Sequence, residues 1–357
     1  MPHFDYSKRL NDLKNRRNQT GTLLKKSMSG IATDSQYKMA LSESYENINE
    51  ALSVKYLLGA MQPVDEHYTR DTYAEGEKVK SALFLLNKCG FDIEFEYQGS
   101  VTNNTHIKSH SDIDILTLTK GFVTLQSPQR ATQPYHGDPI ADLCMLRNSC
   151  YEVLTRSFPN TVVDNNGAKS ISLAGGTLQR KIDVVPSNWY DTLAYTQTGL
   201  NYRRGVMVLD YKKKQRFSNT PFYHNKLLEQ KDIATHGNYK KMVRLLKTIK
   251  ADANGIIKLS SYDIAALLYH MDDKKYDVED APLLLISNSV TFLVNIYQSV
   301  DHRNQLKVPD QSRLIFEEHR NKISDLHELI KAYLKIFEDA KNDMEYSGYS
   351  INKEITI

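Results

Sequence analysis

The chain has 357 residues, and its 46 Lys and Arg against 43 Asp and Glu give a formal net charge of +3 with His counted as neutral. This length favours about two domains and is sufficient for a large core without disulfides or structural metals. The near balance of charge argues against a protein coated in positive charge to hold long nucleic acid. Cys89, Cys144 and Cys150 show no CxxC spacing and form no disulfide framework, so we expect a reducing, cytoplasmic compartment.

Neither a signal peptide nor a membrane span is expected. The first residues, MPHFDYSKRLNDLKNRR, carry charges where a signal peptide needs an apolar segment. No stretch approaches the roughly 18 uninterrupted apolar residues that indicate a membrane-spanning helix. We therefore expect a soluble protein with no membrane partner.

The first 90 residues are predicted to be mainly helical. Apolar residues recur at helical spacing over residues 7–60. A further amphipathic helix is expected at residues 75–89, with Val79, Leu83 and Leu86 on one stripe.

Strands are expected in the middle of the chain, and helices return after residue 232. Alternating apolar and acidic residues mark half-buried strands, and Gly175–Gly176 is typical of a hairpin turn. The predicted strands are 91–97, 112–119, 162–163, 170–173 and 181–185. The predicted helices are 140–158, 238–251, 261–271, 279–300 and 310–339. A mixed α/β core between about residues 60 and 230, with helices from both ends of the chain, is the simplest architecture for this order.

The segment from Gly99 to Asp114 carries the strongest chemical signal. Gly99–Ser100 follows one predicted strand, and the next strand opens with Asp112-Ile-Asp114. Because strand side chains alternate between faces, Asp112 and Asp114 project to the same side and repel each other unless a cation lies between them. Mg²⁺ prefers oxygen ligands and suits this position. Gly99 permits close approach of a phosphate, which the Ser100 hydroxyl and nearby N–H groups can hold.

A third carboxylate lies in the later segment Arg180-Lys-Ile-Asp183-Val-Val-Pro186. If this strand lies beside the strand of Asp112 and Asp114, Asp183 completes a cluster able to hold two Mg²⁺ ions about 4 Å apart. An isolated Asp-x-Asp is usually a solvated strand edge. The combination of Gly-Ser, Asp-x-Asp and a later strand Asp is much more specific, so we predict Asp112, Asp114 and Asp183 as metal ligands and catalytic residues.

This combination of Gly-Ser with three strand carboxylates resembles the polymerase-β-type nucleotidyltransferase superfamily. Members of that superfamily transfer a nucleotidyl group from an NTP to a hydroxyl and release pyrophosphate. Two later segments, Gly237-Asn-Tyr-Lys-Lys-Met-Val-Arg244-Leu-Leu-Lys247-Thr-Ile-Lys250 and Leu259-Ser260-Ser261-Tyr262, are similar to the helical lobe of cyclic GMP–AMP synthase and its bacterial DncV-like relatives, the CD-NTases.

The resemblance runs from about residue 40 to residue 340 and implies an α+β, two-lobed nucleotidyltransferase fold. The catalytic lobe, with a mixed sheet and the N-terminal helices, would occupy residues 1–230. A C-terminal helical lobe, similar to that of oligoadenylate synthase, would occupy residues 231–357.

The resemblance also implies roles for four residues of the helical lobe. Lys247 matches a lysine that reaches the donor triphosphate, and Arg244 lies one turn away on the same face. Ser261 matches a serine that contacts the terminal phosphates, and Tyr262 matches an aromatic ring that stacks on a nucleobase, a contact of about 1–3 kcal/mol. Alternatives stay open, because Tyr262 also suits a core position and Lys247 a solvated helix face.

One departure from the family pattern matters. Animal members carry a His/Cys zinc site before the helix of Arg244, whereas residues 221–239 contain His224 and His236 but no Cys. We therefore expect no zinc. The same departure, with the near-neutral charge, argues against activation by long nucleic acid.

The resemblance implies synthesis of a cyclic di- or trinucleotide second messenger from NTPs, with ATP and GTP as the first expected substrates. The enzyme would be a cytoplasmic monomer in bacterial anti-phage (CBASS) signalling, using two Mg²⁺ ions or Mn²⁺ in their place. A separate cyclic-nucleotide-sensing effector would read the product. Two alternatives remain: a nucleotidyltransferase that modifies RNA 3′-ends or a protein, as toxins do, and an inactive nucleotide-binding scaffold. The helical lobe has no added basic RNA-binding region, and all three carboxylates of an active enzyme are present.

Overall fold

The computed structural model describes residues 4–14, 44–107, 112–316 and 320–355. The chain forms two compact units. One, called here the sheet unit, comprises Asp65–Asn104 and Ser111–Leu227. The other, called the helical unit, comprises Met1–Val64, Thr105–His110 and Leu228–Ile357. Residues 15–43 of the predicted N-terminal helices lie outside the described residues.

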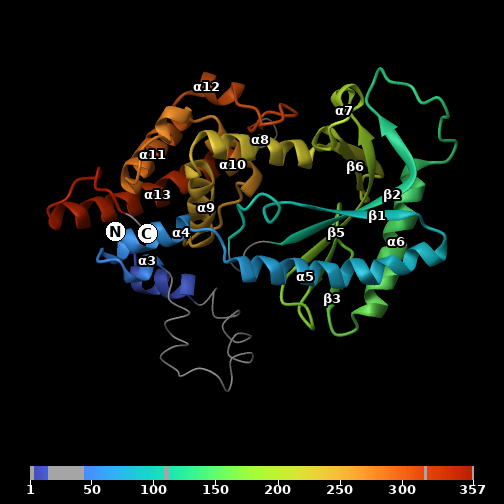
Figure 1. The fold of residues 1–357 in the computed structure, drawn as a ribbon, viewed down its shortest axis with the longest axis horizontal. Helices are drawn as coiled ribbons and strands as arrows, with labels where there is room; N and C mark the ends of the chain where they lie inside the picture. Colours follow the sequence, from blue (N-terminus) through green and yellow to red (C-terminus); the bar gives the residue numbers. More distant parts are fainter. Residues whose placement is uncertain (1–3, 15–43, 108–111, 317–319, 356–357) are drawn as a thin grey trace. The chain divides into compact units, whose positions relative to one another are not determined.

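The sheet unit is built on a seven-stranded mixed sheet (Figure 1). Strands β2 and β5 run parallel, and all other neighbours are antiparallel. The order is β1-β2-β5-β4-β3, with β6 also beside β5 and β7 beside β6. The strands are β1 (Ile93–Gln98), β2 (Ile113–Leu125), β3 (Val162–Asp164), β4 (Ile171–Ala174), β5 (Ile182–Asp191), β6 (Gly205–Asp210) and β7 (Gln215–Asn219).

The two faces of this sheet have different environments. Helices α5 (Glu66–Leu83) and α6 (Pro139–Ser157), with the 3₁₀ segment η1 (Phe84–Cys89), pack on the face formed by Ile113 and Ile115. The opposite face carries a smaller apolar cluster that includes Leu116 and Leu118. Since strand residues alternate, Asp114 lies on this second face. Three further elements complete the unit: α7 (Leu193–Thr198), η2 (Asn201–Arg203) and the start of α8 (Pro221–Ala234).

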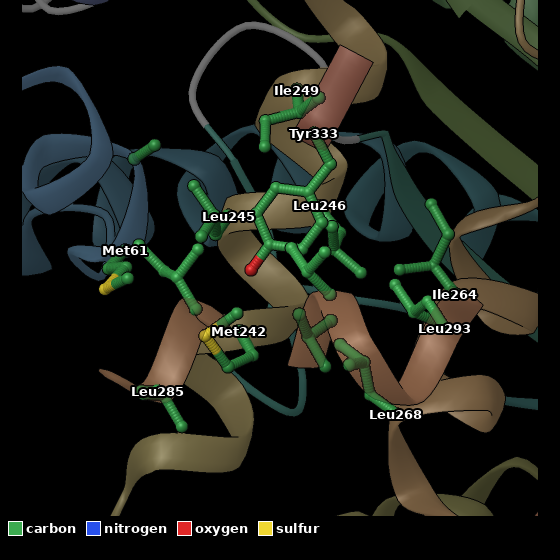
Figure 2. Packing of buried hydrophobic residues seen from close by; sticks show 14 of the residues in the cluster. Met61, Met242, Leu245, Leu246, Ile249, Ile264, Leu268, Leu285, Leu293 and Tyr333 are labelled. Atoms are coloured by element: carbon green, nitrogen blue, oxygen red, sulfur yellow. The ribbon is translucent and has the colours of Figure 1, made fainter. Parts of the chain in front are cut away.

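The helical unit has one large apolar core, part of which is drawn in Figure 2. Helix α9 (Asn238–Ala251) contributes Met242, Leu245, Leu246 and Ile249 at the spacing of one helix face. Its other elements are a helix over residues 6–14, α3 (Ser44–Asn47), α4 (Leu52–Met61), α10 (Ser261–Tyr269), η3 (Asp273–Lys275), α11 (Pro282–Gln298), α12 (Val300–Gln305) and α13 (Arg320–Tyr346). None of the helices in the described part of the chain is long and apolar enough to cross a membrane.

Two predicted helices begin elsewhere in the structure. The helix expected at 75–89 begins at Glu66, because Asp65 caps it by accepting hydrogen bonds from the N–H groups of His67 and Tyr68. The helix expected at 310–339 begins only at Arg320. The preceding segment forms an antiparallel bridge between Lys307 and Leu314.

Candidate active site

The three predicted carboxylates come together on the second face of the sheet. The parallel pairing of β2 with β5 places Asp114 opposite Asp183. Asp112 directly precedes β2 and is two residues from Asp114, so it lies on the same side. On the opposite side of β2 from β5, Gln98, the last residue of β1, pairs with Asp114. Gly99 and Ser100, which directly follow β1, therefore lie close to the carboxylates.

Gly99 occupies a position that no other residue fills without strain. Its φ is +86°, in the region that side chains with a Cβ rarely adopt, and a Cβ there would collide with the Asp114 carboxylate. The turn is closed by Thr102, whose N–H and Oγ1 both donate to the Gly99 carbonyl, at 3.2 and 2.7 Å. Ser100 is the second residue of this turn and is half-buried. Backbone and hydroxyl donors beside a carboxylate cluster are suited to a phosphate that arrives with a cation.

Lys181 is a residue of this cluster that the sequence reasoning missed. Its Nζ lies 2.6 Å from Asp112 Oδ2 and 2.9 Å from Asp183 Oδ2, so one ammonium group bridges two carboxylates. The alternation of β5 was the available signal, because residues 181 and 183 of a strand share a face. Among the described residues, no group of three or more His, Cys, Asp or Glu is arranged to hold a metal ion.

The electrostatics of the cluster nevertheless fit a divalent cation. Burial, and then the charges of Asp183 and Asp112, raise the pKa of Asp114 to about 7. Within the described part of the chain, the buried Oδ1 of Asp183 has no hydrogen-bond partner. Three carboxylates form the oxygen donor set that Mg²⁺ prefers. A bound cation would favour the ionised form of Asp114 and give Asp183 Oδ1 a partner.

Lys247 and Arg244 lie on α9 in the helical unit. Both are almost fully buried, rather than on a solvated helix face. Lys247 Nζ donates to the Thr105 carbonyl at 2.6 Å, and burial, followed by repulsion from Lys250 and Arg244, lowers its pKa to about 7. Arg244 Nε donates to the Met61 carbonyl at 2.7 Å, and burial lowers its pKa to about 10.

Ser261 and Tyr262 begin helix α10. The helix is capped by Ser260, whose hydroxyl accepts a hydrogen bond from the Asp263 N–H, which leaves Ser261 exposed as the first helical residue. Tyr262 is half-buried against the apolar core, and the Arg313 guanidinium lies 5.3 Å from its ring centroid. The structure thus groups Gly99, Ser100 and the three Asp in the sheet unit, and the other four predicted residues in the helical unit.

Comparison with known proteins identifies the family of this chain. The family model for the C-terminal helical domain of cGAS/DncV-like nucleotidyltransferases matches residues 226–338. A cyclic dinucleotide synthase CdnE from Yersinia aleksiciae is 34% identical over 333 residues, which cover 89% of this chain and 87% of the relative. The chain belongs to the cGAS/DncV-like nucleotidyltransferase family.

Further relatives agree with this assignment. A c-di-GMP synthase from the Lachnospiraceae bacterium strain RUG226 is 28% identical over 366 residues, 95% of this chain and 99% of the relative. The structure of a STING-associated CdnE c-di-GMP synthase from Capnocytophaga granulosa matches with a TM-score of 0.73 at 26% identity, covering 95% of this chain and 99% of that one. The predicted family, the two-lobed α+β fold and the nucleotidyltransferase activity are thereby confirmed.

Proposed function

We propose that this nucleotidyltransferase joins two NTP molecules, ATP or GTP, into a cyclic dinucleotide. The observation that carries the proposal is the register of Asp114 opposite Asp183, with the Gly99–Ser100 turn at the end of the neighbouring strand. The names of the relatives, cyclic dinucleotide synthase and c-di-GMP synthase, support a product of this class.

The residues of the sheet unit position the phosphate and hydroxyl groups of the substrates. The Ser100 hydroxyl and the N–H groups of the turn hold the donor triphosphate. A ribose hydroxyl of the second nucleotide attacks the donor α-phosphorus in line. The new bond is ribose oxygen to phosphorus, and the phosphorus–oxygen bond to pyrophosphate breaks. A second transfer within the same site closes the ring. Positioning and neutralisation of charge lower the barrier, so no covalent nucleophile is needed.

Asp112, Asp114 and Asp183 would hold Mg²⁺, or Mn²⁺ in its place. Two such ions supply Lewis-acid activation of the attacking hydroxyl and neutralisation of the leaving pyrophosphate. The Lys181 ammonium group bridges Asp112 and Asp183. A cation held by these carboxylates would take over their neutralisation, and Lys181 would then be available to a phosphate.

The helical unit contributes the remaining proposed contacts. Lys247 and Ser261 bind the triphosphate, with Arg244 one turn from Lys247. Tyr262 stacks on a nucleobase. Since burial lowers the pKa of Lys247 to about 7, an approaching phosphate would restore its full positive charge.

The biological role follows from the product class. The Capnocytophaga granulosa relative is a STING-associated c-di-GMP synthase. By analogy, we propose that the product of this chain acts in the cytoplasm as an anti-phage second messenger and binds a separate effector. The enzyme itself would act as a monomer without a long nucleic acid activator.

The test is to incubate the purified protein with Mg²⁺ or Mn²⁺ and labelled NTPs, and then with phosphatase. We expect a phosphatase-resistant cyclic dinucleotide that requires the divalent ion and is lost in Asp114→Asn. Asp92→Asn is the matched control, because Asp92 is an exposed carboxylate of the same unit that pairs with Lys120. Label found only on added tRNA or protein would instead identify a nucleotidyltransferase with a macromolecular acceptor.

A further inference from the structure

A cavity of about 370 Å³ opens in the sheet unit. This volume lies in the range of small-molecule sites. Its walls combine two carboxylates, a guanidinium group and aromatic rings. The residues that form these walls are Glu94, Glu96, Trp189, Asn201, Tyr202, Arg204 and Phe222.

The cavity lies on the same sheet face as the carboxylate cluster. Glu94, Glu96 and Gln98 alternate along β1 and therefore share a face, and Gln98 is paired with Asp114. At about 3.3 Å per residue, Glu96 lies roughly 7 Å along the strand from the level of Asp114. A nucleotide with a ribose hydroxyl at the carboxylates would extend its base in this direction.

Two of the residues that line the cavity, Trp189 and Arg204, are fixed by contacts with neighbouring side chains. The Trp189 indole N–H donates to Glu94, which fixes the ring. The Arg204 guanidinium lies 4.2 Å from the Trp189 ring centroid and donates through Nε to Asp191 Oδ1 at 2.6 Å. That bond uses one of the five N–H donors of the guanidinium group.

Glu96 is the carboxylate best placed to meet a ligand. It lies two residues from Glu94 on the same face of β1, and it is exposed to solvent. Desolvation, followed by the charge of Glu94, raises the pKa of Glu96, and the charge of Lys80 partly offsets this rise. The rings of Tyr202 and Phe222 add apolar faces for stacking.

We propose that this cavity binds the guanine base of a GTP substrate, with Glu96 as its specificity-determining residue; the inference rests on the proposed function. The Glu96 carboxylate accepts hydrogen bonds from guanine N1–H and the 2-amino group. Arg204 donates to the acceptors O6 and N7, a pairing that is common in guanine recognition. Adenine would direct its N1 lone pair at the carboxylate and its 6-amino donor at the guanidinium, so both contacts would become repulsive.

Binding of non-reactive analogues tests the proposal without turnover. Calorimetry would measure GTP and ATP analogues with a methylene group in place of the oxygen that bridges the α- and β-phosphates. We expect the wild type to prefer the GTP analogue, and Glu96→Gln to weaken that analogue about 10- to 100-fold. Affinity for the ATP analogue should be unchanged, which also shows that the variant is folded. Glu152→Gln, an exposed carboxylate on α6, is the matched control.

The outcomes separate this inference from the proposed function. No preference for guanine in the wild type, or an equal effect of Glu96→Gln on both analogues, would overturn the base assignment even if a cyclic product forms. Selective loss of the GTP analogue would support the base assignment even if the wild type forms no cyclic product. An inosine analogue, which lacks the 2-amino group, should bind with intermediate affinity.

Discussion

Lys247 places an ionisable ammonium group where almost no water reaches it. Only 4% of the residue is exposed, and Nζ has the Thr105 carbonyl as an acceptor. Burying a charge without a counter-ion is unfavourable, which is why its pKa falls to about 7. A site built to bind phosphate can tolerate this cost to stability, because the ligand supplies the missing negative charge.

A substitution of Lys247 should separate stability from binding. In the folded protein the pKa of Lys247 is about 7, against 10.5 for an ordinary lysine side chain, so between these pH values only the unfolded state binds the proton. The wild type should therefore gain about 1.4 kcal/mol of stability per pH unit above pH 7, and no such gain should occur below it. Lys247→Met should lack this slope, be more stable than the wild type at pH 7, and bind NTP analogues at least about tenfold more weakly.

Urea unfolding at pH 7 and pH 9 measures this difference directly. Lys331→Met is the control, since Lys331 is 59% exposed on α13 and should retain the wild-type slope. Parallel stability curves for the wild type and Lys247→Met would show that Lys247 remains protonated in the folded protein.

At the residue scale, the sequence predicted side chains whose positions follow from local alternation. Asp112 and Asp114 share a face in any strand, and the only assumption for Asp183 was that its strand lies beside theirs, which the structure shows. Whether these residues bind metal stays a prediction. Lys181 and the cavity around Glu96 were missed because ion pairing and cavities depend on three-dimensional contacts between β1, β5 and the segments after β5.

At the scale of elements, the start of α10 depends on the buried carboxylate of Asp263 and its two cationic partners. Asp263 is 2% exposed; its Oδ1 lies 2.6 Å from Arg313 Nη2 and its Oδ2 lies 3.2 Å from Lys322 Nζ. Arg313 also covers the Tyr262 ring. Residues 310–315 were predicted to be helical, but in the structure this segment is not helical and places Arg313 beside Asp263. The pattern of apolar residues in the sequence contained no sign of that ion pair.

Loss of this carboxylate should destabilise the protein strongly. Asp263→Ala removes the buried carboxylate that the partly exposed Arg313 and Lys322 share, so we expect the free energy of unfolding to fall by about 3 kcal/mol. Asp272→Ala is the control, because Asp272 is exposed and accepts one backbone hydrogen bond from Lys274, and it should cost about 1 kcal/mol. Chemical denaturation measures both. A loss below about 1 kcal/mol in Asp263→Ala would show that the ion pairs do not hold α10.

At the scale of the whole molecule, the helical unit is assembled from both ends of the chain, and the sheet unit lies between them in the sequence. The predicted boundary at residue 230 lies near the change of unit at Leu227/Leu228, but the segment up to Val64 groups with the helical unit. Among the described residues up to Val64, periodicity predicted the helices that the structure shows, but it could not assign them to a core. That assignment rests on which apolar faces meet, and α4 meets α9 in the core of the helical unit.

The helical unit should therefore fail to fold from residues 228–357 alone. Val54, Tyr56 and Leu57 of α4 are fully buried in the same cluster as α9, and a fragment without them exposes that apolar surface to water. We expect this fragment to bind the dye ANS and to lack a cooperative thermal transition, and co-expression with residues 1–64 should restore one. Residues 65–227 are the control, because both apolar clusters of the sheet unit lie within them and they should fold alone. A cooperative transition of 228–357 alone would show that α4 merely covers a core that α9 to α13 already complete.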